Sequence, residues 1–194
     1  GVMLRQIDLL PALHAIVATS VSKHANDSDY LTELNAWSGR YGSVAGVPAR
    51  NTPATDPSAA IPARFFAGPA LEQPSDVSPD DDNAVMLALG TETDDDLARL
   101  RAGEATSLVL LSATAMGLAS CPVTEPLEIP ETRDAVRTDV FGTSGYPQML
   151  LRVGWAAVNA DPLPATPRRP LPDVADWLND GAFIVGSDVV SHAG

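Results

Sequence analysis

The chain has little positive charge. Its 194 residues include 12 Lys and Arg against 25 Asp and Glu, for a formal net charge of −13, and Lys23 is the single lysine. A protein that binds a polynucleotide must neutralise phosphates with clustered cations. The sequence therefore argues against a nucleic-acid partner. Against this acidic background the adjacent Arg168 and Arg169 are the one doubled cation, and they form a candidate local anion site.

Other scarcities narrow the class of protein. Cysteine occurs once, at Cys121, so the chain cannot form an internal disulfide, which agrees with a reducing compartment. No apolar run approaches the ~20 residues of a membrane-spanning helix. The first apolar stretch is interrupted by His14 and has no cationic leader, unlike a secretory signal. We therefore expect a soluble, cytoplasmic protein with no membrane partner.

Aromatic residues make up 5% of the chain and hydrophobic residues 45%, so Ala, Val and Leu must fill the core. The length predicts one domain or slightly more. Residues 1–40 read as two helices, because apolar residues recur at near-helical spacing over 3–20 and Asp27 can cap a second helix that ends at Gly39. Residues 41–83, dense in Pro, Ser and Asp, predict a long irregular segment.

Residues 84–172 carry the strongest signals of regular structure. The apolar run 84–89 predicts a buried strand, and the acidic residues at 93–96 cap and open a long helix. Leucines recur on one face of that helix and more apolar residues widen it. We expect it to be buried almost all round after Gly103 and to stop at Pro122.

The remaining segments are shorter. A helix is predicted over 131–140, with Arg133 and Arg137 facing solvent. The nearly continuous apolar run over 149–158 predicts a covered strand, and residues 173–194 are expected to form a C-terminal tail. No internal repeat is visible.

Hydrolase and metal chemistry have little support in the sequence. No serine or cysteine lies in a GxSxG nucleophile elbow. The histidines at His14, His24 and His192 are dispersed, and the acidic run 80–82 lacks the alternating oxygen ligands and glycine of a calcium loop. We predict no metal site. Cys121, with no second cysteine and an apolar helix before it, is expected to be a packing residue rather than a redox thiol.

Several short motifs follow one another in a fairly specific order. A buried helix is followed by a small-residue turn with Cys and Pro, an arginine-bearing helix, a GYP turn, a strand ending in VGW, and PRRPL. In this order the chain resembles the nitroreductase superfamily, and within it the actinobacterial, dormancy-associated Acg family. The matching motifs are AGEATS (102–107), TAMGL (114–118), GYPQMLLRVG (145–154), TPRRPL (166–171), HANDSDYLTEL (24–34) and GVP (46–48).

The resemblance implies an α+β fold, in which a mixed, mainly antiparallel sheet is wrapped by helices, and an FMN cofactor at the interface of two similar halves. In typical nitroreductases the halves are the subunits of a dimer. In Acg-like proteins one chain holds both, and an excursion covers the flavin as a lid. The arginine-rich phosphate motif of the first half is absent here. The chain therefore resembles the second half of such a protein, which would pair with a first half or with a second copy.

The resemblance also implies cofactor-binding residues. Arg168 and Arg169 match the basic motif that contacts the FMN phosphate, where guanidinium groups give bidentate, charge-assisted bonds. The alternative is a solvated pair on a tail. Glu104, in its AGEA context, either lines the site or belongs to the polar stripe of its helix.

A second group of residues matches the loop whose backbone passes the flavin ring. Pro122, Val123, Thr124 and Glu125 occupy this loop, and one of its N–H groups would point at flavin N5 or O4. The alternative is an ordinary helix-to-strand connection. The run Arg64–Phe66 belongs either to the flavin lid or to a loop anchored on the local core.

Three functions follow from these expectations. The first is an FMN-dependent oxidoreductase that passes hydride from NAD(P)H through flavin N5 to a nitroaromatic or quinone-like acceptor, with no catalytic acid or base supplied by the chain. The second is a flavin-binding or storage protein whose lid shuts the ring away, with little or no turnover. The third is an interaction half that needs another chain to complete the fold.

Overall fold

A computed structural model describes residues 1–8, 10–41, 45–56, 59, 61–71, 83–142, 144–156, 164–177 and 183–185. The acidic run 80–82, most of the predicted C-terminal tail and parts of the irregular segment 41–83 lie outside the described residues. Among the described residues, no helix combines the length and the apolarity needed to cross a bilayer.

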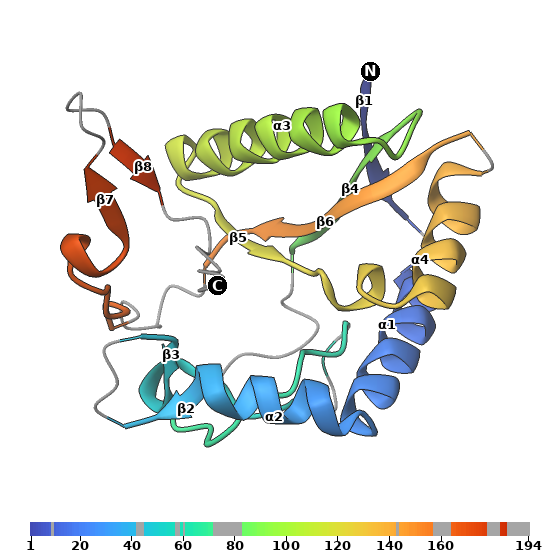
Figure 1. Cartoon of the computed structure of the whole chain (residues 1–194). Helices are drawn as coiled ribbons and strands as arrows, with labels where there is room; N and C mark the ends of the chain where they lie inside the picture. The colour runs from blue at the N-terminus through green and yellow to red at the C-terminus, as the bar shows by residue number, and fades with distance from the viewer. Residues whose placement is uncertain are drawn as a thin grey trace, which may run out of the picture.

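A four-stranded antiparallel sheet forms the centre of the fold (Figure 1). Its strands are β1 (Val2–Ile7), β4 (Val85–Thr91), β6 (Tyr146–Gly154) and β5 (Ala119–Pro122), in that spatial order. The register pairs Leu4 with Leu89 and Leu87 with Leu151. The strands predicted around 84–89 and 149–158 are confirmed, and with the helices on both faces the chain has the α+β fold that was expected.

Helices cover both faces of this sheet. On one side lie α1 (Leu10–Ala25) and α4 (Pro130–Val136), and on the other lies α3 (Asp96–Ala115), which runs along the top of Figure 1. Side chains of a strand alternate between faces. Met86 and Ala88 of β4 accordingly enter the cluster with α1 and α4, whereas Leu89 enters the cluster with α3.

The first residues form a strand and not the start of a helix, which corrects the prediction for 3–20. Met3 and Ile7 pack into one core cluster and Val2 packs into the other, as the two-residue period of a strand requires. Pairing with residues 86–91 of β4 outweighs the local helical spacing, because propensity is a weak signal beside tertiary contacts. The helix α1 begins only at Leu10, with Pro11 in its first turn, where a missing N–H costs nothing.

The second predicted helix is confirmed as α2 (Ser28–Trp37). The side chain of Asp27 caps it by accepting hydrogen bonds from the N–H groups of Asp29 and Tyr30. After α2 the chain forms a small parallel pair, β2 (Ser38–Arg40) and β3 (Val47–Pro48), and a 3-10 turn, η1 (Ala49–Asn51). The described part of 41–83 is otherwise irregular, as predicted.

The long helix α3 differs from the prediction in two ways. It ends at Ala115, because Gly117 takes a φ of +73° and turns the chain into β5, so Pro122 does not stop it. It is also not buried all round: only its sheet-facing side is covered. Five large apolar side chains are more than half exposed along the helix and its cap, at Leu97, Leu100, Leu108, Leu111 and Met116.

The helix predicted over 131–140 is α4 followed by one π-helical turn, η4 (Arg137–Phe141). Its arginines do not simply face solvent, which corrects that prediction. Arg133 donates to both carboxylate oxygens of Asp94, at 2.8 and 3.0 Å, and Arg137 donates to the carbonyl of Gly145. These bonds tie the helix to the start of α3 and to the turn before β6. The remaining elements are a 3-10 turn, η5 (Leu171–Asp173), and a short hairpin of β7 (Ala175–Trp177) and β8 (Phe183–Val185).

Candidate functional site

The loop predicted to pass the flavin ring leaves the end of the edge strand β5. Pro122 pairs with Leu151, and the N–H of Val123 donates to the carbonyl of Leu150 at 2.9 Å, so the ladder extends one residue beyond the strand. A 3-10 turn, η3 (Glu125–Leu127), follows. Pro122 is exposed, whereas Val123 packs against the core. The loop is thus fixed at its start by the sheet.

The carboxylate of Glu125 fixes the other end of the loop. Its side chain is 5% exposed, and its Oε1 lies 2.7 Å from Nδ1 of His24 at the end of α1. Its other oxygen, Oε2, accepts a hydrogen bond of 2.8 Å from Nε of Arg64. Three segments far apart in the sequence therefore meet at one buried acid.

A second acid, Glu128, extends this arrangement. Arg64 Nη2 donates to Glu128 Oε1 and, at 3.2 Å, to the hydroxyl of Thr124, which itself donates to Glu128 at 2.7 Å. Nε2 of His24 lies 4.0 Å from the other oxygen of Glu128. The guanidinium of Arg64 thus contacts both carboxylates through different nitrogens, as its fork geometry allows.

Tyr30 of α2 is the last member of this group of contacting side chains. Its ring stacks on the ring of His24 with centroids 3.9 Å apart and planes 5° from parallel, and the guanidinium carbon of Arg64 lies 6.0 Å from its centroid. Burial, and then the charge of Glu125, raise the pKa of the Tyr30 phenol to about 12. We call the following residues the Arg64 cluster: His24, Tyr30, Arg64, Thr124, Glu125 and Glu128.

The Arg64 cluster has the residue types of a metal site, but the guanidinium of Arg64 already pairs with its carboxylates. Ligand atoms of His24, Glu125 and Glu128 lie within 4.8 Å of one another. However, Arg64 bonds both carboxylates. Although burial works in the opposite direction, Glu128 and then Glu125 raise the pKa of the Arg64 guanidinium, which therefore stays charged. A metal ion would have to displace Arg64.

Sequence reasoning found only part of this arrangement. It placed Thr124 and Glu125 in one loop and Arg64 in a candidate lid, but it gave His24 no role. The residues bonded to Glu125 lie 101 and 61 positions away. The sequence carries no spacing signal over such distances, although the HANDSDYLTEL motif does contain both His24 and Tyr30.

The other predicted site residues lie elsewhere. Glu104 is exposed on α3. Arg168 and Arg169 are exposed, and Arg168 donates to the carbonyls of Thr166 and Pro167 in its own segment. Within the part of the chain that the structure describes, no hydrogen bond or ion pair connects these three residues with the loop.

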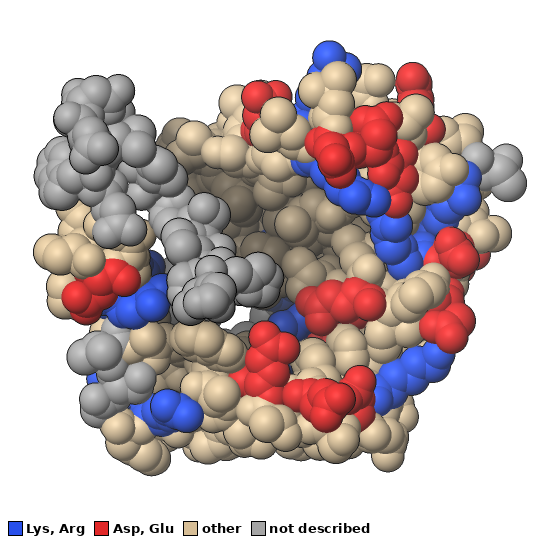
Figure 2. Space-filling view, viewed as in Figure 1, with Lys and Arg blue, Asp and Glu red and all other residues tan. Residues whose placement is uncertain are grey.

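The segment that carries the arginine pair is anchored close to the irregular region. Arg50 and Asn51 of η1 donate to the carbonyls of Ala165 and Pro164, at 3.1 and 2.6 Å. On the face drawn in Figure 2, the molecule is hollowed between α3 at the top and α2 at the bottom, and acidic side chains lie along the lower rim.

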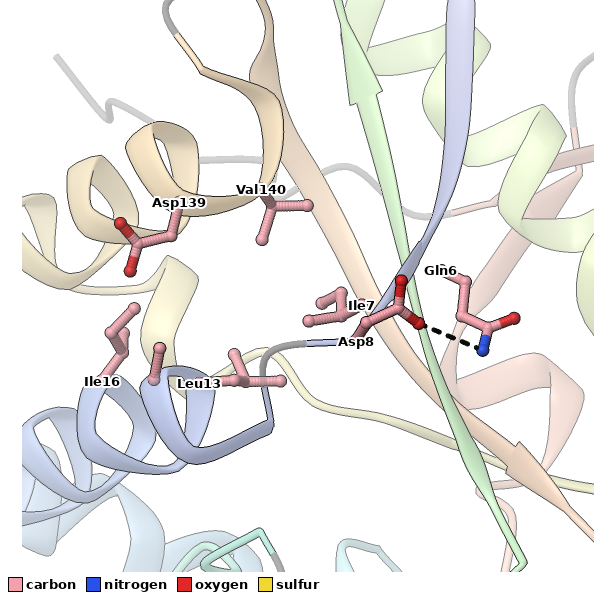
Figure 3. A pocket seen from close by; sticks show the side chains of 8 residues that line it. Gln6, Ile7, Asp8, Leu13, Ile16, Asp139 and Val140 are labelled. Carbon is pink, nitrogen blue, oxygen red and sulfur yellow. Dashed lines mark hydrogen bonds between the residues drawn. The ribbon is translucent and has the colours of Figure 1, made fainter.

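A separate cavity of about 180 Å³ opens between β1, the first turns of α1 and η4 (Figure 3). Its floor is apolar, with Ile7, Leu13 and Val140, and its rim carries Asp8 and Asp139. None of the cofactor-binding residues predicted from the sequence lines it. It therefore does not belong to the candidate site.

Comparison with known proteins gives one matching family and several relatives. Residues 20–155 match the sequence model of the nitroreductase family. The protein "Putative NAD(P)H nitroreductase Rv3131" of Mycobacterium tuberculosis H37Rv is 71% identical over 177 residues, which cover 91% of this chain and 52% of that protein. "Putative NAD(P)H nitroreductase acg" of the same strain is 34% identical over 169 residues, or 86% of this chain and 50% of that protein. The chain thus spans about half the length of the curated relatives it matches.

Among solved structures, a nitroreductase with bound FMN from Bacteroides fragilis is similar at 14% identity and a TM-score of 0.48. The match covers 85% of this chain and 71% of that chain.

Proposed function

The chain belongs to the nitroreductase family, as its motifs predicted, and from this premise we propose that it supplies half of an FMN-binding oxidoreductase site. Hydride transfer from NAD(P)H to an acceptor such as a nitroaromatic or a quinone is the chemistry that bound FMN would supply. The chain's own residues would bind the cofactor, orient it and exclude water.

The observation that carries this proposal is the way the loop after β5 is held. Pro122 has no N–H, and the N–H of Val123 is used by Leu150. The carboxylate of Glu125 is used by His24 and Arg64. Among the described residues, the N–H of Thr124 has no acceptor. The N–H of Glu125, at the first position of the 3-10 turn, likewise has none among them. A rigid loop with available N–H groups fits the edge of a flavin ring, whose N5 and O4 accept hydrogen bonds.

This geometry refines the expected roles of the loop residues. We assign the hydrogen bond toward the flavin to the N–H of Thr124 and the ring contact to the exposed Pro122. Glu125 would support the loop from behind and not touch the cofactor. The fit with FMN thus rests on backbone and apolar surface, as flavin electronics require no acid or base from the protein.

The arginine pair remains the proposed phosphate contact. In the described part of the chain neither Arg168 nor Arg169 is paired with an acidic side chain, so both guanidinium groups are available to a phosphate dianion. Glu104 is proposed only as a residue at the edge of the site, since its side chain is exposed on α3.

We propose that the exposed face of α3 is covered in the complete protein by the first half of the fold or by a second copy of the chain. The face presents Leu108, Leu111 and Met116, each more than 65% exposed. Large contiguous apolar patches on soluble proteins usually mark interaction surfaces. This partner would supply further contacts to the flavin.

A binding or storage protein is the second candidate function. It is supported by Arg64, whose hydrogen bonds to Glu125 and Thr124 hold part of the irregular segment 41–83 against the loop after β5. A lid over a flavin on this loop would need such an attachment. An oxidoreductase and a storage protein differ in whether nicotinamide reaches the ring.

Anaerobic reduction separates the two functions. The visible spectrum of the FMN-loaded protein is recorded before and after NADPH is added without oxygen. An oxidoreductase loses its oxidised-flavin bands within the time of mixing or soon after. A storage protein keeps them with NADPH but loses them with dithionite. If the protein retains no bound flavin, so that neither reductant changes its spectrum, the proposal of an FMN site is wrong.

A further inference from the structure

We propose that Arg64 is a positioning residue: it locks residues 61–71, as a strap, onto the loop 122–128, and so sets both the conformation and the accessibility of that loop. The ordering of strap and loop does not depend on any cofactor. Its consequence for flavin rests on the function proposed above.

The buried carboxylate of Glu125 needs a permanent cation beside it. Glu125 is nearly inaccessible, and a buried carboxylate is costly unless it is both paired and hydrogen-bonded. Of the two groups that pair with it, His24 and Arg64, only Arg64 carries a permanent positive charge. Removal of Arg64 would leave Glu125 with His24 alone and two carboxylates facing each other. The loop would have to open to hydrate them.

Arg64 holds the loop at more than one point. Arg64 donates to Glu125, to Glu128 and to the hydroxyl of Thr124. These three acceptors span the whole turn from the end of β5 to the start of α4. One planar guanidinium group bonds all three acceptors. It fixes their relative positions more tightly than three separate partners would.

The strap is also anchored away from the loop. At its far end, the N–H groups of Ala70 and Leu71 donate to the carbonyl of Thr52, and the N–H of Ala67 donates to the hydroxyl of Ser38. These bonds tie the strap to the region around η1, not to the sheet. Ile61 packs on the core, but among the described residues the hydrogen bonds between strap and loop all come from Arg64. Arg64 is therefore the polar cross-link between the two.

The same loop carries the exposed Pro122 and the N–H of Thr124. Arg64 donates a hydrogen bond to the hydroxyl of Thr124. The strap and the backbone that is proposed to face the flavin should therefore move together. A strap held in this place would limit how closely the ring approaches the loop. Loss of Arg64 would thus change ring accessibility without changing any group that touches the flavin.

Amide hydrogen exchange of the full chain tests the proposal. Arg64→Gln should raise exchange rates in 61–71 and 122–128 by about 10-fold or more, because local opening is governed by local stability. Rates in β4 and β6 should stay as in the wild type. Arg50→Gln is the matched control: it removes an arginine of the same irregular segment that donates to a backbone carbonyl, and it should leave both regions unchanged.

Two further variants separate positioning from general damage. Arg64→Lys keeps the positive charge but not the planar guanidinium group. It should restore part of the protection from amide exchange that Arg64→Gln loses. Arg64→Gln combined with Glu125→Gln removes the uncompensated charge, and should slow exchange in 122–128 again while 61–71 stays fast. If Arg64→Gln is unfolded, Glu128→Gln, which removes one of the three contacts, should loosen the same two segments to a smaller extent.

Wild-type exchange in Arg64→Gln would overturn the proposal, and so would an increase that is equal in β4, β6 and the loop. A parallel FMN titration keeps the two proposals apart. If the exchange pattern is found and the wild type binds no FMN, the positioning role stands and the proposed cofactor function fails.

Discussion

The carboxylate of Glu125 lies between an imidazole and a guanidinium, and each of these partners has a separate effect. His24 offers a hydrogen bond of 2.7 Å and, through its stacking on Tyr30, packs α1 against α2. We expect His24→Ala to lower the free energy of unfolding by about 1–3 kcal/mol, because a buried acceptor loses its partner. Urea denaturation measures this free energy of unfolding. Thr19→Ala, which removes an exposed hydroxyl on the same helix, is the control and should change stability by less than about 0.5 kcal/mol.

The carboxyl group of Asp94 predicts how the free energy of unfolding depends on pH. Hydrogen bonds from Arg133, and then from Gln148 and Arg99, hold the pKa of Asp94 far below its ordinary value of 3.8. A carboxylate whose pKa is lowered by folding stabilises the protein above its unfolded pKa, and this contribution is lost as the pH falls toward the folded pKa.

The variant Asp94→Asn should therefore be less stable than the wild type at pH 7, by about 1–3 kcal/mol, and the difference should shrink below about pH 4. Denaturation midpoints at pH 7, 5, 4 and 3 measure it. Asp96→Asn is the control, because Asp96 is fully exposed and should show no such trend. A difference that stays constant down to pH 3 would contradict the assigned role of Arg133.

Two glycines, one inside α3 and one just beyond its end, give a matched pair of tests for this helix. A methyl group at Gly103 or Gly117 would meet no atom within 4 Å, but Gly117 has a φ of +73° whereas Gly103 is helical. Gly103→Ala should stabilise the protein by about 0.5–1 kcal/mol. Gly117→Ala should destabilise it by about 1 kcal/mol. Thermal or urea unfolding measures both, and equal effects of the same sign would show that α3 does not end at this glycine.

The elements show where sequence patterns suffice and where they fail. The caps at Asp27 and at 93–96 and the apolar strands were predicted correctly, because their signals lie within a few residues. The strand β1 was missed because its pairing with β4 is a long-range effect. The helix α3 was expected to be buried all round, since leucines on every side normally indicate a core. In the structure of this chain its outer leucines have no cover.

The candidate site follows the same pattern. Motif order led to the loop after β5, and the carboxylate of Glu125 does lie in that loop. Its partners could not be predicted, because they come from α1 and from an irregular segment with no periodicity. The buried position of Glu125 changes its proposed role from cofactor contact to support.

At the scale of the whole molecule, the outer face of α3 predicts association. Leu108→Glu with Leu111→Glu should leave the free energy of unfolding within about 0.5 kcal/mol of the wild type, because both side chains are exposed. It should shift a dimeric or aggregating species toward monomer in sedimentation velocity. Leu4→Glu, an exposed leucine on β1, is the control. Unchanged association in the double variant would remove the assignment of this face as the interface.

We propose that the loop after β5 faces a flavin through the N–H of Thr124, and an FMN titration followed by flavin fluorescence and visible absorption tests this hydrogen bond. Thr124→Val removes the hydroxyl but keeps the N–H, whereas Thr124→Pro removes both. We predict saturable binding with perturbed flavin bands for the wild type and Thr124→Val, and weaker binding or lost perturbation for Thr124→Pro. Equal binding by Thr124→Pro and Thr124→Val would contradict the assigned hydrogen bond, and free-flavin spectra for the wild type at every concentration would contradict the FMN site itself.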